Sequence, residues 1–375
     1  MFTTQDQDNR RAGARGLTRN HNGGIARRLR RAAAGAVCTA AVALPLIGAA
    51  SAQAATTTTP TYTKLSLVNG WTPYGFGTAN PAVANISGIV HLKGAIKTSG
   101  TNAVAFTLPK ADRPAARVYV PVDMCDASNG RLDITPNGVA QVEPEGSNWS
   151  NASCFTSLDG VTFAKSATSF TPLTLVNGWA SYGSGTASPA ARNISGIVQL
   201  KGAMYTGGTD QMAFTLPVGD RPAVGVNVPV DLCNATNGSL VIYPSGTALV
   251  YSEGAWSDAS CFTSLDGVSF AASATSFTPL TLQNGWTSYP GEASPAVRKI
   301  SGIVHLEGAM QNGTAPEAFT LPAGFRPAHD VYVKVELSDS TNGRLHITPS
   351  GSVTVEGNWA EAPGFTSLNG VSFAI

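Results

Sequence analysis

The chain has 375 residues, of which 43% are apolar and 13% are charged, a composition that excludes a disordered or highly charged protein. The charge is unevenly spread, because eight of the 24 basic residues but only two of the 23 acidic residues precede residue 55. The rest of the chain therefore has 16 basic and 21 acidic residues, a net charge of −5. Nucleic-acid binding needs clustered Lys and Arg, so we expect no nucleic-acid partner.

Residues 1–54 have the features of a signal peptide. Residues 27–31 read Arg-Arg-Leu-Arg-Arg, small apolar residues follow up to Ala50, and Ala50-Ser51-Ala52 fits an Ala-x-Ala cleavage site. We predict that this leader is removed and that the protein is secreted and extracellular, with no membrane span in the mature chain. An uncleaved anchor is the alternative, and the sequence does not distinguish the Sec from the twin-Arg export route.

The remainder of the chain repeats one unit three times. Leu-Val-Asn-Gly-Trp at 67–71 recurs at 175–179 and, with Gln for Val, at 282–286, a spacing of 108 and then 107 residues. A period of this length fits a whole small domain rather than a solenoid repeat. After a Thr-rich tether at 55–63, we predict repeat 1 (64–164), a linker (165–171), repeat 2 (172–271), a linker (272–278) and repeat 3 (279–375). Phe170 and Phe277 in the linkers could dock on a neighbouring repeat, or the joint could simply have been copied.

Within a repeat the pattern is that of β-strands. Val118, Val120 and Val122 alternate with other residues, the period of two of a strand. Residues 132–135 and 139–142 flank Pro-Asn-Gly, which predicts a hairpin, and the Asp-Gly at 159–160 predicts another. Long helical periodicity is missing from the sequence. We therefore predict an all-β protein of three tandem β-sandwich or jelly-roll domains, each of about 107 residues.

Four cysteines follow the leader, and their three pairings are open on number alone. They are Cys125, Cys154, Cys233 and Cys261. The matching positions of repeat 3 are Ser338 and Gly364, so both cysteines are absent together. Paired loss favours bridges within a repeat, Cys125 with Cys154 and Cys233 with Cys261. Disulfides agree with a secreted protein.

The residues that commonly carry catalysis do not recur in all three repeats. His91 and His305 are equivalent, but Gln199 takes their place in repeat 2, which argues against a shared histidine-based catalytic or zinc site. The oxygen-rich segment from Asp123 to Gly130 lacks the spacing of an EF-hand, and an Asx turn is the favoured interpretation. We predict no metal and no cofactor.

Two acidic positions recur and leave a glycan hydrolase as a less favoured alternative. The first is Asp123, Asp231 and Glu336; the second, Glu145, Glu253 and Glu356, depends on where a gap is placed. A pair of carboxylates across a cleft would be needed for hydrolysis, whereas exposed turn carboxylates are much more common. We therefore predict a protein that is not an enzyme.

Aromatic residues are the strongest candidates for ligand binding. The six tryptophans occupy two positions in each repeat, and the first of these is followed three residues later by a tyrosine in a polar, Gly-rich segment. Such side chains can stack on a sugar ring. The candidate residues are Trp71, Tyr74, Trp179, Tyr182, Trp286 and Tyr289. The alternative is that these tryptophans cap the core, and that Trp149, Trp256 and Trp359 pack on the second cysteine.

Several runs give the repeats a family resemblance. In repeat 1 they are Ser-Gly-Ile-Val-His-Leu-Lys-Gly at 87–94, Phe-Thr-Leu-Pro at 106–109, Arg-Pro at 113–114, Gly-Arg-Leu-Asp-Ile at 130–134 and Ser-Leu-Asp-Gly-Val-Thr-Phe at 157–163. Together they resemble the head-type β-sandwich domains of phage tail fibres and receptor-binding proteins. The resemblance implies trimeric heads that recognise host-surface saccharides, so the three repeats could pack as a pseudo-trimer. The leader and the cysteines depart from a phage structural protein.

These observations favour a secreted, non-enzymatic protein that binds a surface polysaccharide or another cell-wall component through several weak sites at once. Linked sites gain avidity only where their geometry allows simultaneous contact. The alternative is a structural or adhesive protein that recognises another protein.

Overall fold

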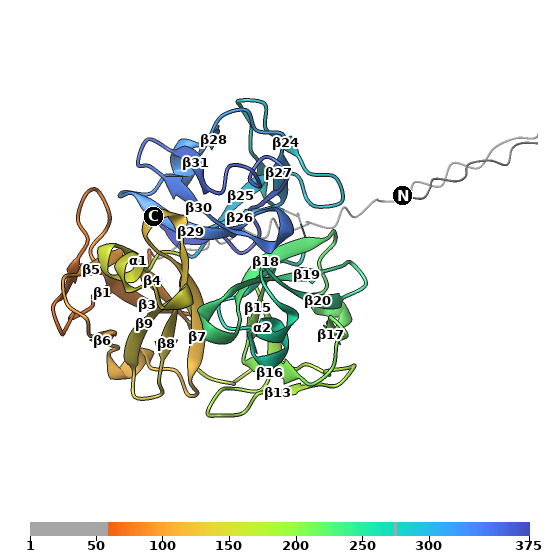
Figure 1. Cartoon of the computed structure of the whole chain (residues 1–375). Coiled ribbons are helices and arrows are strands. Elements are labelled where there is room, and N and C mark those ends of the chain that lie inside the picture. The colour runs from red at the N-terminus through yellow and green to blue at the C-terminus, as the bar shows by residue number, and fades with distance from the viewer. Residues whose placement is uncertain (1–58, 274–275) are drawn as a thin grey trace, which may run out of the picture. The chain divides into compact units, whose positions relative to one another are not determined.

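The computed structural model describes residues 59–273 and 276–375 (Figure 1). This part of the chain is all-β, as predicted, and it contains only two α-helices, both short. The predicted leader, residues 55–58 of the tether, and residues 274–275 of the second linker lie outside the described residues. No helix in the described ranges is long and apolar enough to cross a membrane.

Repeat 1 is built from short antiparallel strands. They are β1 (Thr63–Lys64), β2 (Trp71–Pro73), β3 (Ala82–Ile86), β4 (Ile89–Lys93), β5 (Ala95–Thr98), β6 (Val104–Thr107), β7 (Val118–Asp123), β8 (Asn129–Ile134), β9 (Val139–Pro144), β10 (Thr156–Ser157) and β11 (Thr162–Ala164). Its helical segments are η1 (Lys110–Asp112), η2 (Cys125–Ala127), η3 (Glu145–Ser147) and α1 (Trp149–Cys154).

Repeats 2 and 3 follow the same order of elements. Repeat 2 has β12 (Thr171–Pro172), β13 (Trp179–Ser181), β14 (Ala190–Ile194), β15 (Ile197–Lys201), β16 (Ala203–Thr206), β17 (Met212–Thr215), η4 (Val218–Asp220), β18 (Val226–Asp231), η5 (Cys233–Ala235), β19 (Asn237–Ile242), β20 (Thr247–Ser252), α2 (Trp256–Cys261), β21 (Thr263–Ser264) and β22 (Ser269–Ala271). Repeat 3 has β23 (Thr278–Pro279), β24 (Thr287–Ser288), β25 (Ala296–Ile300), β26 (Ile303–Glu307), β27 (Ala309–Gln311), β28 (Glu317–Thr320), η6 (Ala323–Phe325), β29 (Val331–Glu336), η7 (Ser338–Ser340), β30 (Asn342–Ile347), β31 (Ser352–Gly357), β32 (Thr366–Ser367) and β33 (Ser372–Ala374).

Each repeat contains three sheets around one apolar core. In repeat 1 the strand orders are β1-β3-β4-β11, β10-β5-β2 and β6-β9-β8-β7, and equivalent orders recur in the other two repeats. Phe106, Leu132 and Ile134 have no exposed surface and lie in the core of repeat 1. The first residues of β12 and β23 belong to the predicted linkers, so each joint ends by pairing with the next repeat.

The strand pattern of the sequence is reproduced in β7, where Val118, Val120 and Val122 are buried. The predicted hairpin between β8 and β9 forms, with Gly138 at φ 83° in its turn. The hairpin predicted at Asp-Gly 159–160 is wrong, because β10 pairs with β5 whereas β11 pairs with β4. The turn instead carries the chain between two sheets, and the buried Asp159 carboxylate accepts a 2.9 Å hydrogen bond from the Gly94 amide.

Both predicted disulfides are confirmed. Cys125 pairs with Cys154 and Cys233 with Cys261, each with its Cα atoms 6.1 Å apart. Each bridge joins a short helix to the turn that follows a strand: α1 to η2 after β7, and α2 to η5 after β18. Two disulfides indicate a protein that matures in an oxidising compartment.

The contacts between repeats form a closed ring. The strands β7, β18 and β29 contact one another in all three pairings, and they converge near the middle of the described unit in Figure 1. Asparagine side chains repeat the same contact at each joint. Asn129 donates to the Ala235 carbonyl at 2.7 Å, Asn237 donates to the Ser340 carbonyl at 2.6 Å, and Asn342 donates to the Ala127 carbonyl. Repeat 1 thus contacts repeat 2, repeat 2 contacts repeat 3, and repeat 3 contacts repeat 1.

Candidate ligand-binding site

The three candidate tryptophans that begin the predicted binding loops are buried. Trp71, Trp179 and Trp286 expose only 3%, 5% and 4% of their surface, and each indole N–H donates to a backbone carbonyl at 2.8 to 2.9 Å. Each ring also meets the edge of the second tryptophan of its repeat, with centroids 5.9 to 6.1 Å apart. These indoles therefore fit the alternative interpretation as core residues, and their faces are not presented to solvent.

The tyrosines that follow them lie at the joints between repeats. Tyr182 is half-buried and packs edge-on against Phe262, with ring centroids 4.7 Å apart. Phe262 in turn meets Tyr119 of repeat 1 at 5.1 Å. The Arg131 guanidinium lies 4.8 Å from the centre of the Tyr119 ring, a cation–π geometry. These four side chains, with Cys233 and Asn234, line a cavity of about 170 Å³ that we call the Tyr182 site.

A second cavity of about 410 Å³ adjoins the Tyr182 site, since Arg131 and Asn234 line both. Its wall also contains Trp149 and the carboxylate of Glu143. Arg131 is held in place by two carboxylates, Glu143 Oε2 at 2.8 Å and Asp231 Oδ2 at 3.2 Å. Burial disfavours the charged guanidinium, but these carboxylates raise the pKa of Arg131 above its usual value. The joint thus combines aromatic faces with a fixed cation and an acceptor.

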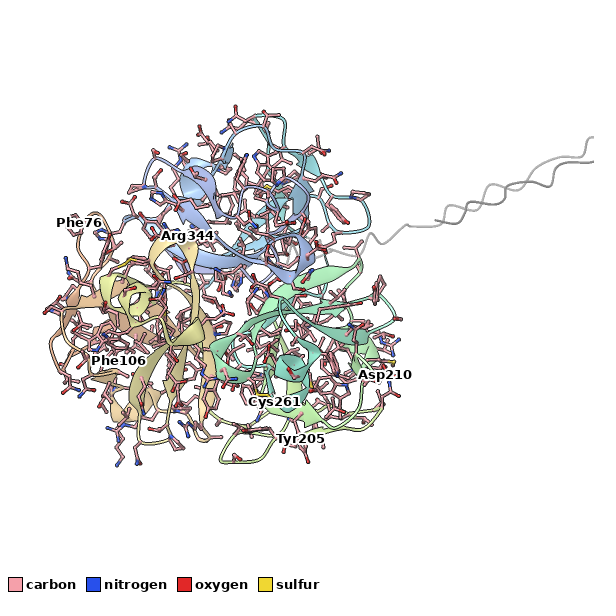
Figure 2. The ribbon with its side chains drawn as sticks, in the orientation of Figure 1. Phe76, Phe106, Tyr205, Asp210, Cys261 and Arg344 are labelled. Atoms are coloured by element: carbon pink, nitrogen blue, oxygen red, sulfur yellow. A yellow bond between two sulfur atoms is a disulfide. The ribbon has the colours of Figure 1, made fainter. Side chains whose placement is uncertain are left out.

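The joint between repeats 3 and 1 carries the same arrangement, which we call the Tyr74 site. Tyr74 packs on Phe155 at 4.7 Å, Phe155 meets Tyr332 of repeat 3 at 5.2 Å, and Arg344 lies 4.9 Å from the Tyr332 ring. Arg344, labelled in Figure 2, also contacts the carboxylates of Asp123 and Glu356. Two joints of the chain therefore bring together the same four types of side chain, and at the Tyr74 site the Tyr332 ring is also stacked on His346, with centroids 4.3 Å apart.

The third joint is incomplete. Tyr289 still packs on Phe365 with centroids 4.8 Å apart. Asn227 and Ser239, however, occupy the positions that hold Tyr119 and Arg131 in repeat 1. This joint therefore offers neither the second tyrosine nor the arginine.

The acidic residues considered for hydrolysis do not form a pair across a cleft. Asp123, Asp231 and Glu336 expose at most 1% of their surface, and burial raises the pKa of both aspartates to about 7. The second acidic position was aligned wrongly. Strand register places Glu143, Tyr251 and Glu356 in equivalent positions, so Glu145 and Glu253 are not the counterparts of Glu356.

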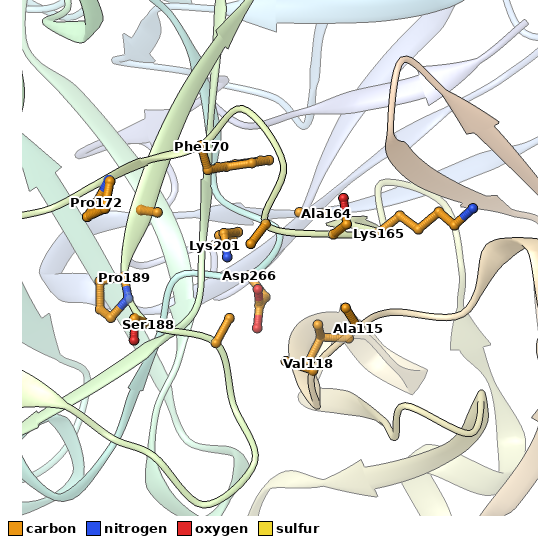
Figure 3. A pocket seen from close by; sticks show the side chains of 15 residues that line it. Ala115, Val118, Ala164, Lys165, Phe170, Pro172, Ser188, Pro189, Lys201 and Asp266 are labelled. Atoms are coloured by element: carbon orange, nitrogen blue, oxygen red, sulfur yellow. The ribbon is translucent and has the colours of Figure 1, made fainter.

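A third cavity, of about 380 Å³, lies where the first linker runs between repeats 1 and 2 (Figure 3). Its walls are mostly apolar and include Val118 and Phe170, the linker residue expected to dock on a neighbour. Its polar side chains include Lys201 and Asp266; burial lowers the pKa of Lys201 and raises that of Asp266 to about 7. This cavity could not be predicted from the sequence, because its lining comes from two repeats and a linker.

Sequence reasoning also missed Tyr119, Arg131, Tyr332 and Arg344. Each belongs to a strand that reads as ordinary alternation, and the two tyrosines contact the next repeat through a phenylalanine, Phe262 or Phe155, across the joint. A signal was present in the uneven distribution of arginine, which occurs at 131 and 344 but is replaced by Ser239 in repeat 2. A residue that differs among otherwise similar repeats can therefore indicate that the joints between the repeats are not identical.

Comparison of the chain with known protein families, with curated proteins and with solved structures finds no match.

Proposed function

We propose that the protein is a secreted, non-enzymatic binding protein that recognises a surface glycan or another cell-envelope component. The observation that carries this proposal is the pair of equivalent joints, the Tyr182 site and the Tyr74 site, each with two tyrosines, a phenylalanine and an arginine. Aromatic faces suit the apolar face of a pyranose ring, while arginine, glutamate and asparagine suit its hydroxyl groups.

Two sites on one chain favour a polymeric ligand. A polysaccharide repeats the same sugar unit along its length, so one strand can engage both joints, and the second contact is then intramolecular. Two weak sites would therefore bind a polymer more tightly than its monosaccharide. The resemblance to tail-fibre heads points the same way, since a ring of three repeats in one chain would imitate a trimeric head.

An adhesive role toward a protein is the second candidate. Phe76 is 76% exposed and its ring lies 5.2 Å from that of Tyr74, so the Tyr74 site has an apolar rim that a protein surface could cover.

The test is retention of the purified protein on a panel of bacterial cell-wall polysaccharides and peptidoglycan. We expect Tyr74→Ala and Tyr182→Ala each to weaken polymer binding about tenfold, the loss of roughly 1.4 kcal/mol of aromatic contact. The double variant should lose avidity altogether. Tyr289→Ala is the matched control, because its joint lacks the arginine, and it should bind as the unchanged protein does.

Two outcomes would overturn the proposal. The first is failure of the folded protein to bind any member of the panel. The second is an equal effect of Tyr289→Ala and Tyr182→Ala, which would mean that the complete joints are not the sites. Binding of a protein ligand that is lost on Phe76→Ser would favour the adhesive role.

A further inference from the structure

The three repeats bring His91, Gln199 and His305 to one place. They occupy the same position on β4, β15 and β26. On β4, Val90 and Leu92 point into the core of repeat 1, so His91 faces away from the core, as its counterparts do in the other repeats. The three side chains line a single cavity of about 50 Å³, whose other walls are isoleucine and serine residues contributed by all three repeats.

The side chains of His91, Gln199 and His305 have no hydrogen-bond partner in the described part of the chain. These three residues are only 7%, 7% and 8% exposed. Buried polar groups are nearly always hydrogen-bonded, and leaving them unpaired costs stability. The atoms of these three side chains are not among the fully buried polar atoms that lack a partner, so they can reach the space beside them, and 50 Å³ is enough for an ion or a water molecule.

The side chains around this cavity are of types that bind metal ions. His91 and His305 offer two imidazoles, and Gln199 offers an amide oxygen. The described residues contain no group of three or more His, Cys, Asp or Glu placed for a metal, so a site here would need the amide oxygen of Gln199 as its third donor.

We propose that His91, Gln199 and His305 form one site for a divalent transition-metal ion, to which each repeat contributes one ligand. Imidazole donors favour Zn²⁺, Ni²⁺ and Cu²⁺ over the harder Mg²⁺ and Ca²⁺. Three protein ligands leave a fourth position for water or an anion. Because the ligands come from all three repeats, the metal stabilises the closed ring.

Two positive charges near the site limit its affinity for a cation. Arg192 and Arg298 lie across the strand pairs from Gln199 and His305. Their guanidinium groups are directed to the carbonyls of Ser87 and Ser195, at 3.2 and 3.3 Å. Two nearby cations weaken the binding of another cation and favour an anion in its fourth position.

Comparing the repeats does not reveal this site. If each repeat is expected to bind its own metal ion, Gln199 at the histidine position of repeat 2 argues against a shared site. In the ring the three positions are parts of one site, and two histidines with one amide are enough. The same reasoning identifies the change that should strengthen it. Gln199→His would place an imidazole in every position.

The experiment is titration of the purified full chain, without a histidine tag and after removal of metals by a chelator, with ZnCl₂ in a calorimeter. We expect one Zn²⁺ per chain and a higher melting temperature in its presence. His91→Ala and His305→Ala should each weaken binding at least tenfold. Gln199→His should tighten it at least tenfold and give Co²⁺ a tetrahedral absorption spectrum. His329→Ala, which alters an exposed histidine, is the control and should bind as before.

The proposal fails if the unchanged protein binds no Zn²⁺ above the level of the His91→Ala/His305→Ala double variant. Failure of Gln199→His to raise affinity would overturn it even if the alanine variants do not fold. The metal site is independent of the glycan sites, because Tyr74→Ala and Tyr182→Ala should leave the zinc titration unchanged.

Discussion

Lys334 compensates for an arginine that is missing from the ring, and its removal is the sharpest test of how the repeats are held together. Asp123, Asp231 and Glu336 are the last residues of β7, β18 and β29, and they are almost fully buried. Arg344 reaches Asp123 and Arg131 reaches Asp231, each at 3.2 Å. The arginine that would reach Glu336 is Ser239 instead.

The missing charge is supplied from repeat 3 itself. Lys334 stands where repeats 1 and 2 have Pro121 and Pro229. Its ammonium group is buried, donates to Asn129 Oδ1 at 2.7 Å, and also donates to Asn342 Oδ1. Lys334 favours the ionised form of Glu336, so each of the three buried carboxylates has a cation in its neighbourhood, although among the described residues only the two arginines form ion pairs with these carboxylates.

The Lys334→Met variant leaves Glu336 without a nearby cation. Removing one partner of a directly paired buried charge costs about 3–5 kcal/mol, and we expect about 3 kcal/mol or less, because Lys334 and Glu336 form no ion pair in the described part of the chain and Glu336 can take up a proton. Burial already raises the pKa of Glu336 well above 4.5, and Lys334 opposes that shift. The interaction with Lys334 stabilises the protein only where Glu336 is ionised, so the deficit of the variant should be smallest at acid pH and grow as the pH rises through the raised folded pKa of Glu336.

Urea unfolding followed by tryptophan fluorescence measures this loss, with Lys110→Met on an exposed 3₁₀ helix as the control. Adding Ser239→Arg to Lys334→Met should restore at least half of the lost stability, because it recreates the arrangement of the other two joints. Equal midpoints for Lys334→Met and Lys110→Met, or no rescue by Ser239→Arg, would refute the charge-matching argument.

Three further predictions concern the interior of single repeats. Changing Cys125 and Cys154 together to serine should lower stability by about 3 kcal/mol, because a loop of 29 residues is no longer closed; reductant should then have a smaller effect on urea unfolding than it has on the unchanged protein. Trp71→Ala should cost about 3–5 kcal/mol in the same assay, as for other buried aromatic residues, and retained folding without cost would contradict its place in the core. Asp266→Asn should make stability less dependent on pH, since burial raises the pKa of Asp266 from 3.8 to about 7 and its contribution is lost as pH rises through that range; the amide fits, because Asn369 accepts the equivalent hydrogen bond. An unchanged pH profile of unfolding would argue against a titrating Asp266.

The sequence was sufficient for features that depend on one repeat alone. Alternation in residues 118–122 predicted β7, and the joint loss of two cysteines in repeat 3 predicted both disulfides. Such signals are local, or they are carried by a comparison of the repeats. The Asp-Gly turn at 159–160 misled for a related reason, because a tight turn has the same residues whether it closes a hairpin or passes between sheets.

Features that form between two repeats could not be predicted from the sequence of either repeat. Tyr119 and Tyr182 belong to different repeats and meet only through Phe262, and nothing in one strand indicates which strand of another repeat lies against it. Trp71 shows that sequence context can also mislead within one repeat. Its polar loop suggested an exposed side chain, but the indole points inward and donates to the Asn102 carbonyl. Burial of a single side chain depends on tertiary packing that composition does not reveal.

The glycine before each final strand gives a direct measure of how closely the repeats approach. Gly267 has φ 87°, and a Cβ added to it would lie 2.7 Å from Val120 Cγ1 of repeat 1; Gly160 and Gly370 have equivalent contacts with Val333 and Val228. Gly183 also has a positive φ, 74°, but no atom lies within 4 Å of its added Cβ.

Gly183→Ala should therefore cost only backbone strain, about 1 kcal/mol. Gly267→Ala should cost about 1–3 kcal/mol more, because it overpacks the joint, and a further Val120→Ala substitution should recover part of that excess in urea unfolding. Equal losses for the two glycine variants would mean that the repeats do not meet at this point. A specific recovery by Val120→Ala would instead locate the added cost in the contact between repeats, since a strained backbone at residue 267 is not relieved by a smaller side chain at residue 120.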